Sequence, residues 1–366
     1  MKPSEAMQFI AGCYRSRKPK PILIGPPGCG KTQICYQLAD EILKIPRYTF
    51  QSTLYDPVEI KGLPVFMRED KSDTRLNGEK RDGGVAQFIR FEDMPTGKEG
   101  LLIIDDLPHA ATQTQNAFMR LLLEGVAGAW ELDGIFPIAT GNKAIHKAGA
   151  KDLQTAMANR FVFIELDVSY EDWRTWAIGH DIVPEIIAYI GTPYGRDWLM
   201  KFEADRQRNP TPRSWEFASD IIKICGADSV QYKKASGKEI SHSILREALH
   251  GCIGDEATSK FLGWLKVYSK LPDLHKIIAG ENLIPDDMDI MYAAVSGLVS
   301  IAKNSLPPKK KSVYQRLVEY SCELPENYAE LAVFLIKDLY KLEKELFQEE
   351  KIDITDWRKK FSSVIL

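Results

Sequence analysis

Short apolar runs alternate with longer stretches of helical pattern over roughly the first 170 residues of the chain. Five of these runs have the length of buried strands, at residues 21–24, 48–52, 101–104, 136–140 and 161–166. Strands that alternate with helices are typical of an α/β domain built on a parallel sheet. We therefore predict such a domain over residues 1–168.

A long polar segment, from about residue 56 to 99, separates the second and third predicted strands. It is rich in glycine and proline and contains the charged run at residues 68–71. Two short apolar runs inside it, at residues 63–67 and 85–91, could pair as a hairpin. Because connections of this length inside a compact domain are usually functional or disordered, we interpret the segment as an insert.

Strand signals disappear after about residue 170, and apolar residues recur at three- and four-residue spacing. This spacing predicts an all-α region. We divide it into an α-helical lid domain at 169–305 and a helical C-terminal extension at 306–366. The predicted helices cover residues 170–178, 215–222, 240–252, 257–268, 287–303, 313–319 and 328–347.

Residues 306–311 (LPPKKK) interrupt the helical pattern with a cluster of charge. The cluster could contact nucleic acid, but no aromatic interleaving or wider basic face accompanies it, which favours a solvated turn. The last long helical stretch, 328–347, has one apolar face. We expect it to close the helical core rather than to bind a partner, so that deletion of residues 325–366 would destabilise the fold.

The composition is that of an ordinary globular protein, with 366 residues, 44% apolar and 27% charged. A formal net charge of −3 gives no general attraction to nucleic acid or anionic membranes. No apolar run is long enough to span a bilayer, and the first residues lack a secretory signal. The six cysteines and six histidines are scattered, so we expect reduced thiols, no structural zinc site and a cytoplasmic protein.

The first predicted strand leads directly into a glycine-rich loop and then into a helical stretch at 33–43. The loop fits the phosphate-binding pattern G-x-x-x-x-G-K-[ST] at every fixed position. Its glycines let backbone N–H groups point at phosphate oxygens, and its lysine places a charge at the β- and γ-phosphates. A chance match is the alternative, and the flanking strand and helix argue against it. The predicted nucleotide-binding residues are Gly25, Pro26, Pro27, Gly28, Cys29, Gly30, Lys31, Thr32 and Gln33.

Two carboxylates, Asp105 and Asp106, end the third predicted strand. Downstream of a phosphate-binding loop, one carboxylate can hold Mg²⁺ and the next can polarise an attacking water. We assign Asp105, together with the hydroxyl of Thr32, to the metal and Asp106 to the water. The alternative is a strand that happens to end in acidic turn residues.

Three further polar residues follow strands or open a helix. Asn142 follows the fourth predicted strand, where an amide can orient a water through both a donor and an acceptor. Arg160 precedes the fifth strand, and a guanidinium suits the charge that develops on a γ-phosphate. Arg213 lies at the start of a helix in the all-α region. Taken alone, these would be a turn residue, a surface arginine and a helix-end ion pair.

Together and in this order, these elements resemble those of the AAA+ ATPases over about residues 20–300. The phosphate-binding loop matches the Walker A motif and residues 101–106 match Walker B. Asn142 matches the first sensor, Arg160 the arginine finger and Arg213 the second sensor. More narrowly, residues 55–64 (YDPVEIKGLP), 159–161 (NRF) and 211–216 (TPRSWE) look like those of MoxR-like ATPases of the dynein-related subfamily, whose clade carries an insert in the second helix.

The resemblance implies ATP and Mg²⁺ as cofactors and a homo-oligomeric ring, commonly a hexamer. ATP would lie between the α/β domain and the lid, with Arg213 acting in cis and Arg160 in trans. The family usually has Asp-Glu in Walker B, whereas this chain has Asp105 and Asp106. Because aspartate is one methylene shorter, we expect slow basal hydrolysis, stimulated by a partner.

Three functions fit these residues. The first is a MoxR-like ATPase that remodels or assembles a protein, in many relatives with a von Willebrand A-type partner. The second is the motor of a nucleic-acid-processing or defence complex, against which the near-neutral charge argues mildly. The third is an ATP-gated scaffold without useful hydrolysis, which Asp106 leaves open. We favour the first.

Overall fold

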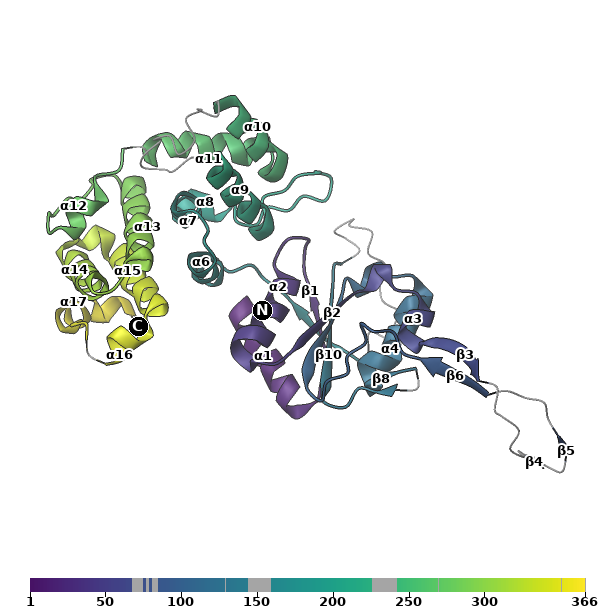
Figure 1. Ribbon diagram of the computed structural model, residues 1–366. Helices are drawn as coiled ribbons and strands as arrows, with labels where there is room; N and C mark the ends of the chain where they lie inside the picture. The colour runs from purple at the N-terminus through teal and green to yellow at the C-terminus, as the bar shows by residue number, and fades with distance from the viewer. Residues whose placement is uncertain are drawn as a thin grey trace. The chain divides into compact units, whose positions relative to one another are not determined.

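The fold is that of a computed structural model, shown in Figure 1. The chain divides into two compact units, Met1–Asp167 and Val168–Leu366. The charged run at residues 68–71 and the start of the helix predicted from residue 240 lie outside the described residues. The structure describes residues 1–67, 75–76, 79–80, 85–128, 130–143, 159–225, 242–268, 270–349 and 351–365.

The first unit is built on a five-stranded parallel sheet with strand order β11-β1-β10-β7-β2. Its strands are β1 (Pro21–Ile24), β2 (Arg47–Gln51), β7 (Gly100–Asp105), β10 (Ile135–Gly141) and β11 (Val162–Glu165). All five correspond to predicted strands. The predicted α/β class with a parallel sheet, followed by a helical region, is therefore confirmed.

Helices cover both faces of this sheet (Figure 1). Helix α4 (Thr112–Glu124) packs Phe118, Leu121 and Leu122 against one face. Helix α1 (Pro3–Ser16), helix α2 (Lys31–Gln37) and the π-helical turn η1 (Leu38–Leu43) belong to the same unit, and α2 contacts β7 and β10. The central strands β1, β7 and β10 are buried at nearly every position. Since side chains alternate between the faces of a strand, these strands are buried on both faces and are therefore apolar at nearly every position.

The segment after β2 contains a short helix and a hairpin. It begins with the 3₁₀ turn η2 (Ser52–Leu54) and α3 (Pro57–Lys61), in which Asp56 and Glu59 form a capping box. The predicted hairpin is confirmed: β3 (Leu63–Met67) pairs with β6 (Val85–Ile89) in antiparallel register. Two further antiparallel pairs join β4 (Arg75–Leu76) with β5 (Glu79–Lys80) and β8 (Val126–Ala127) with β9 (Trp130–Glu131).

The second unit contains helices and connecting segments, with no strand among its described residues. Its helices overlap every stretch predicted as helical from the sequence, with most ends shifted by a few residues. They are α6 (Tyr170–Gly179), α7 (Pro184–Gly191), α8 (Pro193–Arg196), α9 (Pro212–Ile224), α10 (His242–Ile253), α11 (Asp255–Tyr268), α12 (Leu274–Ile278), α13 (Met288–Asn304), α14 (Lys309–Glu323), η5 (Glu326–Tyr328), α15 (Ala329–Leu342), α16 (Lys344–Gln348) and α17 (Thr355–Ile365).

One hydrophobic core runs through this unit, from Tyr170 to Phe361. The division that we predicted between residues 305 and 306 therefore does not coincide with a division of the core. A buried ion pair also crosses the predicted division: Arg174 Nη2 of α6 lies 2.8 Å from Asp338 Oδ2 of α15. The stretch predicted as one helix over 328–347 is broken at Glu343, between α15 and α16.

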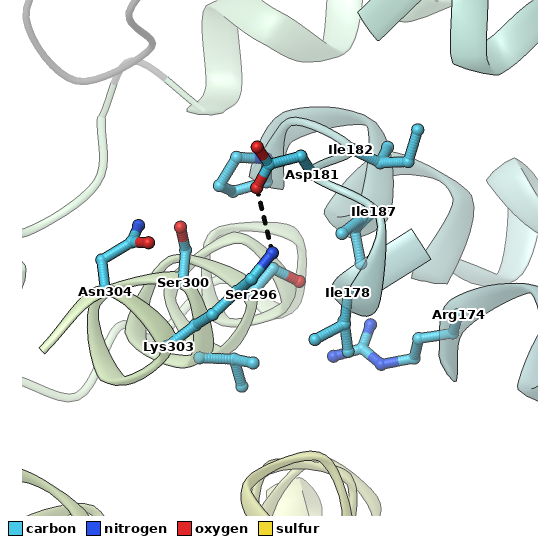
Figure 2. Close-up of a pocket in the computed structure, with 11 residues that line it drawn as sticks. Arg174, Ile178, Asp181, Ile182, Ile187, Ser296, Ser300, Lys303 and Asn304 are labelled. Carbon is cyan, nitrogen blue, oxygen red and sulfur yellow. Dashed lines mark hydrogen bonds and ion pairs between the residues drawn. The ribbon is translucent and has the colours of Figure 1, made fainter. Parts of the chain in front are cut away.

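The predicted turn at residues 306–311 is shorter than expected. Only residues 305–308 lie outside a helix, and the three lysines form the first turn of α14. Lys310 is paired with Glu343. A small cavity of about 40 Å³ lies between α6, α7 and α13, with the Asp181–Lys303 ion pair at its edge (Figure 2). None of the predicted site residues lines it.

Among the described residues, no helix has the length and apolar character needed to cross a membrane. All six cysteines lie within the described part of the chain and none forms a disulfide, and the three in the first unit are buried. Burial, aided by the negative charge of Asp105, raises the pKa of the Cys35 thiol far above its usual range, so this thiol stays protonated.

Candidate functional site

The candidate site forms where four parallel strands end. Because β1, β10, β7 and β2 run in the same direction, the residues that follow them meet at one edge of the sheet. The edge is lined by the phosphate-binding loop after β1, by Gln51 at the end of β2, by Asp105 and Asp106 at the end of β7, and by Asn142 after β10. In open α/β sheets this carboxyl edge is where ligands bind.

The loop between β1 and α2 depends on its glycines. Gly28 and Gly30 have φ values of 78° and 98°, in the left-handed region that residues other than glycine rarely adopt. At Gly25, a side chain would place its Cβ 2.8 Å from the Sγ atom of Cys29. Gly25 also donates a backbone hydrogen bond to Gly141 O at the end of β10. The loop is thus anchored to the adjacent strand while its backbone curves tightly.

The Lys31 side chain turns back into this loop and is 7% exposed. Its ammonium donates to Gly25 O and Pro26 O, both at 3.0 Å, and to Asn142 Oδ1 at 2.7 Å. The structure therefore brings together the loop lysine and the amide that the sequence predicted to share a site.

Thr32 and Asp105 form the second contact between predicted site residues. The Thr32 hydroxyl donates to Asp105 Oδ1 at 2.7 Å, and Thr140 also donates to that oxygen. Hydroxyl and carboxylate oxygens are hard donors that suit Mg²⁺, which is usually held by few protein ligands and several waters. The pair therefore fits the metal role predicted for it. Among the described residues, no cluster of three or more His, Cys, Asp or Glu could hold another metal ion.

Asp106 directly follows β7 with φ 55°, a conformation that aspartate tolerates better than most residues. Its backbone N–H donates to Thr140 Oγ1 at 3.2 Å. Gln51 Nε2 donates to Oδ2 at 3.4 Å, and His109 Nδ1 lies 3.7 Å from Oδ1. Both carboxylate oxygens of Asp106 thus face a polar side chain, and the group stays about one-third exposed.

Asn142 is buried at the tip of β10, with 8% exposed. Its Oδ1 accepts from Lys31, and its Nδ2 lies 3.5 Å from His109 Nε2. The amide therefore connects the phosphate-binding loop to the turn after Asp106. This turn is η3 (Leu107–His109), a single turn of 3₁₀-helix whose Leu107 and Pro108 are buried.

The two predicted arginines belong to other segments of the chain. Arg160 is exposed and precedes β11, with Nη1 3.4 Å from Met119 Sδ of α4. Since Val162 pairs with Pro21 and Glu165 with Ile24, Arg160 lies at the end of the sheet where β1 begins, opposite the phosphate-binding loop. The length of β11 alone separates the two ends by roughly 13 Å. The exposed Arg213 lies in the first turn of α9 in the second unit, after the cap residue Thr211.

Three polar residues at the site were not predicted from the sequence: Gln51, His109 and Thr140. Each is a common residue type outside any motif. Gln51 ends a strand, as Asp105 does, and it pairs with Asp105 in register, so strand order is the signal that could have found it. His109 is brought back over Asp106 because residues three apart are stacked in a 3₁₀ turn.

Comparison with known proteins gives similarity of fold alone. No protein-family model and no curated protein sequence matches the chain. The RuvB Holliday junction branch migration motor of Thermotoga maritima superimposes with a TM-score of 0.34 at 13% identity, covering 81% of this chain and 80% of that chain. NtrX from Brucella abortus gives TM-scores of 0.35 in complex with ADP and 0.33 in complex with ATP. The identities are 11% and 12%, over 100% and 99% of this chain and 68% of each NtrX chain.

Superpositions this distant indicate no subfamily, substrate or partner. The fold assignment rests on the chain itself: a parallel sheet in the order β2-β7-β10-β1-β11, with a phosphate-binding loop after β1, is the arrangement of the AAA+ core.

Proposed function

We propose that the chain is an Mg²⁺-dependent ATPase. One observation carries the proposal: Lys31, Thr32, Asp105 and Asn142 converge at the carboxyl edge of the sheet. The Lys31–Asn142 and Thr32–Asp105 contacts are both 2.7 Å. An ammonium, a hydroxyl–carboxylate pair and a buried amide beside a glycine-rich loop are the groups that binding and cleaving a triphosphate requires.

The loop and Lys31 would bind the phosphates. Backbone N–H groups of residues 28–32 would cradle the chain of phosphates, since Pro26 and Pro27 have no N–H. The ammonium of Lys31 would leave its carbonyl partners to contact the β- and γ-phosphates. Thr32 and Asp105 would hold Mg²⁺, which when bound neutralises charge on the β- and γ-phosphate oxygens. These groups mainly position the substrate and offset its charge.

Asp106 and Asn142 would act on the attacking water. The Asp106 carboxylate accepts a proton or a hydrogen bond from the water, and the Asn142 amide orients it. Aspartate places its carboxylate one methylene closer to the backbone than glutamate does. We therefore propose slow basal turnover that a partner accelerates.

We further propose that the chain works as a homo-oligomeric, hexameric ring of MoxR-like type. An arginine at the far end of its own sheet cannot reach the phosphates beside Lys31, which supports a role for Arg160 in a neighbouring subunit. Arg213 would act from the helical unit of its own chain. Rotation of that unit on hydrolysis would remodel or assemble a partner protein, of von Willebrand A type in our proposal.

The test is ATP binding and hydrolysis by the full chain with excess Mg²⁺. We expect Mg²⁺-dependent turnover that EDTA abolishes. Lys31→Ala should weaken ATP binding at least tenfold and remove turnover, because the charge at the β- and γ-phosphates is lost. Lys143→Ala, an exposed lysine one residue after Asn142, is the matched control and should leave ATP binding unchanged.

Equal ATP affinity in Lys31→Ala and the control would contradict nucleotide binding at this site. Turnover that rises severalfold with DNA would instead favour a motor of a nucleic-acid-processing or defence complex. Tight ATP binding with assembly and no turnover would favour a nucleotide-gated scaffold.

A further inference from the structure

His109 lies next to two of the proposed catalytic residues, Asn142 and Asp106. Its side chain is 15% exposed. One ring nitrogen, Nε2, lies 3.5 Å from Asn142 Nδ2, and the other, Nδ1, lies 3.7 Å from Asp106 Oδ1. The ring thus stands between the two side chains that are proposed to handle the attacking water.

The hydrogen-bond network fixes which atoms face each other. An ammonium only donates, so the oxygen of the Asn142 amide must be the atom that faces Lys31. The amide nitrogen therefore faces His109 and donates to Nε2. In the neutral ring, an accepting Nε2 leaves the proton on Nδ1, which faces the Asp106 carboxylate. At 3.7 Å this last contact is electrostatic rather than a short hydrogen bond.

The backbone is shaped to bring His109 to this place. Its N–H donates to Asp106 O at 2.8 Å, which closes the 3₁₀ turn η3 over the carboxylate. Pro108 of the same turn packs against β10, where a Cβ on Gly141 would lie 2.5 Å from the proline ring. Only glycine at position 141 allows this close approach, which brings His109 within reach of Asn142.

We infer that His109 is a positioning residue, which holds the Asn142 amide and the Asp106 carboxylate in one relative orientation. The inference rests on the proposed hydrolysis. When Lys31 moves to the phosphates, Asn142 Oδ1 loses its ammonium partner. The hydrogen bond to His109 then keeps Nδ2 turned toward the ring and Oδ1 turned toward the nucleotide. His109 does not itself touch the substrate.

The test separates chemistry from binding. In the full chain, His109→Ala should lower kcat for ATP about 10- to 100-fold, because misplacement by about 1 Å costs this much. The dissociation constant for ADP, measured by calorimetry, should change less than twofold, because the loop and Lys31 remain intact. His275→Ala, an exposed histidine of α12, is the control and should leave both quantities unchanged.

Two conservative variants, His109→Gln and His109→Asn, test the two ring nitrogens separately. Glutamine can replace the acceptor at Nε2, and asparagine can replace the donor at Nδ1, so each should recover part of the kcat that alanine loses. These variants also cover the case in which alanine perturbs folding. In Asn142→Ala, adding His109→Ala should lower kcat by a smaller factor than it does in the wild type, since the part of the effect that acts through the Asn142 amide is already lost.

The outcomes distinguish this inference from the proposed function. If the wild type hydrolyses ATP and His109→Ala retains full kcat, the inference is wrong and the ATPase proposal stands. A loss confined to ADP affinity, or additive losses in the double variant, would also overturn it. A wild type without turnover would contradict the proposed hydrolysis and remove the basis of the inference.

Discussion

Asp106 is the residue whose chemistry departs most from the pattern that the sequence resembles. Its carboxylate is held by Gln51 on one oxygen and faces His109 on the other. Because the side chain is one methylene short, the carboxylate is expected to reach the attacking water poorly. Asp106→Glu should therefore raise kcat for ATP, by about tenfold if one hydrogen bond to the water improves by roughly 1.4 kcal/mol.

Single-turnover hydrolysis is the appropriate measurement, because product release can mask a faster chemical step. Asp106→Asn serves as the matched control: it keeps the short side chain, removes the charge and should lower the rate. An unchanged or lower rate in Asp106→Glu would show that the shorter carboxylate does not limit hydrolysis.

At the scale of single residues, the sequence predicted those that belong to a motif with a known chemical role. The loop lysine and threonine follow a fixed pattern, and in the structure Lys31 contacts Asn142 while Thr32 contacts Asp105. Gln51 and His109 follow none. Their places depend on strand order and on a 3₁₀ turn, neither of which a local pattern encodes.

The helical unit depends on contacts between elements that lie far apart in the chain. Arg174 of α6 is 4% exposed and Asp338 of α15 is 2% exposed, and the hydroxyl of Tyr170 lies 2.9 Å from Arg174 Nη1. Removing one partner of a buried pair leaves an uncompensated charge in the core. Residues 325–366 therefore supply part of the core rather than a separable tail.

Asp338→Ala should lower the free energy of unfolding of the helical unit by about 3–5 kcal/mol. Asp181→Ala is the control, because the Asp181 carboxylate is 84% exposed in its pair with Lys303. This substitution should lower the free energy of unfolding by less than about 1 kcal/mol. Denaturation followed by tryptophan fluorescence reports on this unit, since every tryptophan except Trp130 lies in it. Equal losses in the two variants would contradict a structural role for the buried pair.

Whole elements were predicted best where burial leaves a clear apolar pattern in the sequence. The five strands and the amphipathic helices α11 and α13 show clear apolar spacing, so the sequence assigned them with small errors at their ends. Helix α7 was not predicted, because all its residues from Glu185 to Gly191 are buried and its sequence therefore shows no polar face. The break between α15 and α16 was missed because the apolar spacing continues across it.

At the scale of the whole molecule, the proposed activity requires more than one chain. The predicted lysine, threonine, aspartates and asparagine gather at one end of the sheet, whereas Arg160 lies at the other end and is exposed. Ring size and the identity of a partner depend on surfaces of other molecules, which the fold of one chain does not encode. The role of Arg160 is therefore the point at which assembly and chemistry can be tested together.

The most direct test measures ATP turnover and particle mass in the same samples, for the wild type and Arg160→Ala with ATP and Mg²⁺. We predict that both chains assemble into a ring and that the variant loses turnover by on the order of 10³-fold, as expected when an arginine finger is removed. A wild type that stays monomeric and inactive, or a variant that assembles and hydrolyses ATP at the wild-type rate, would contradict a ring-forming ATPase with Arg160 acting between subunits.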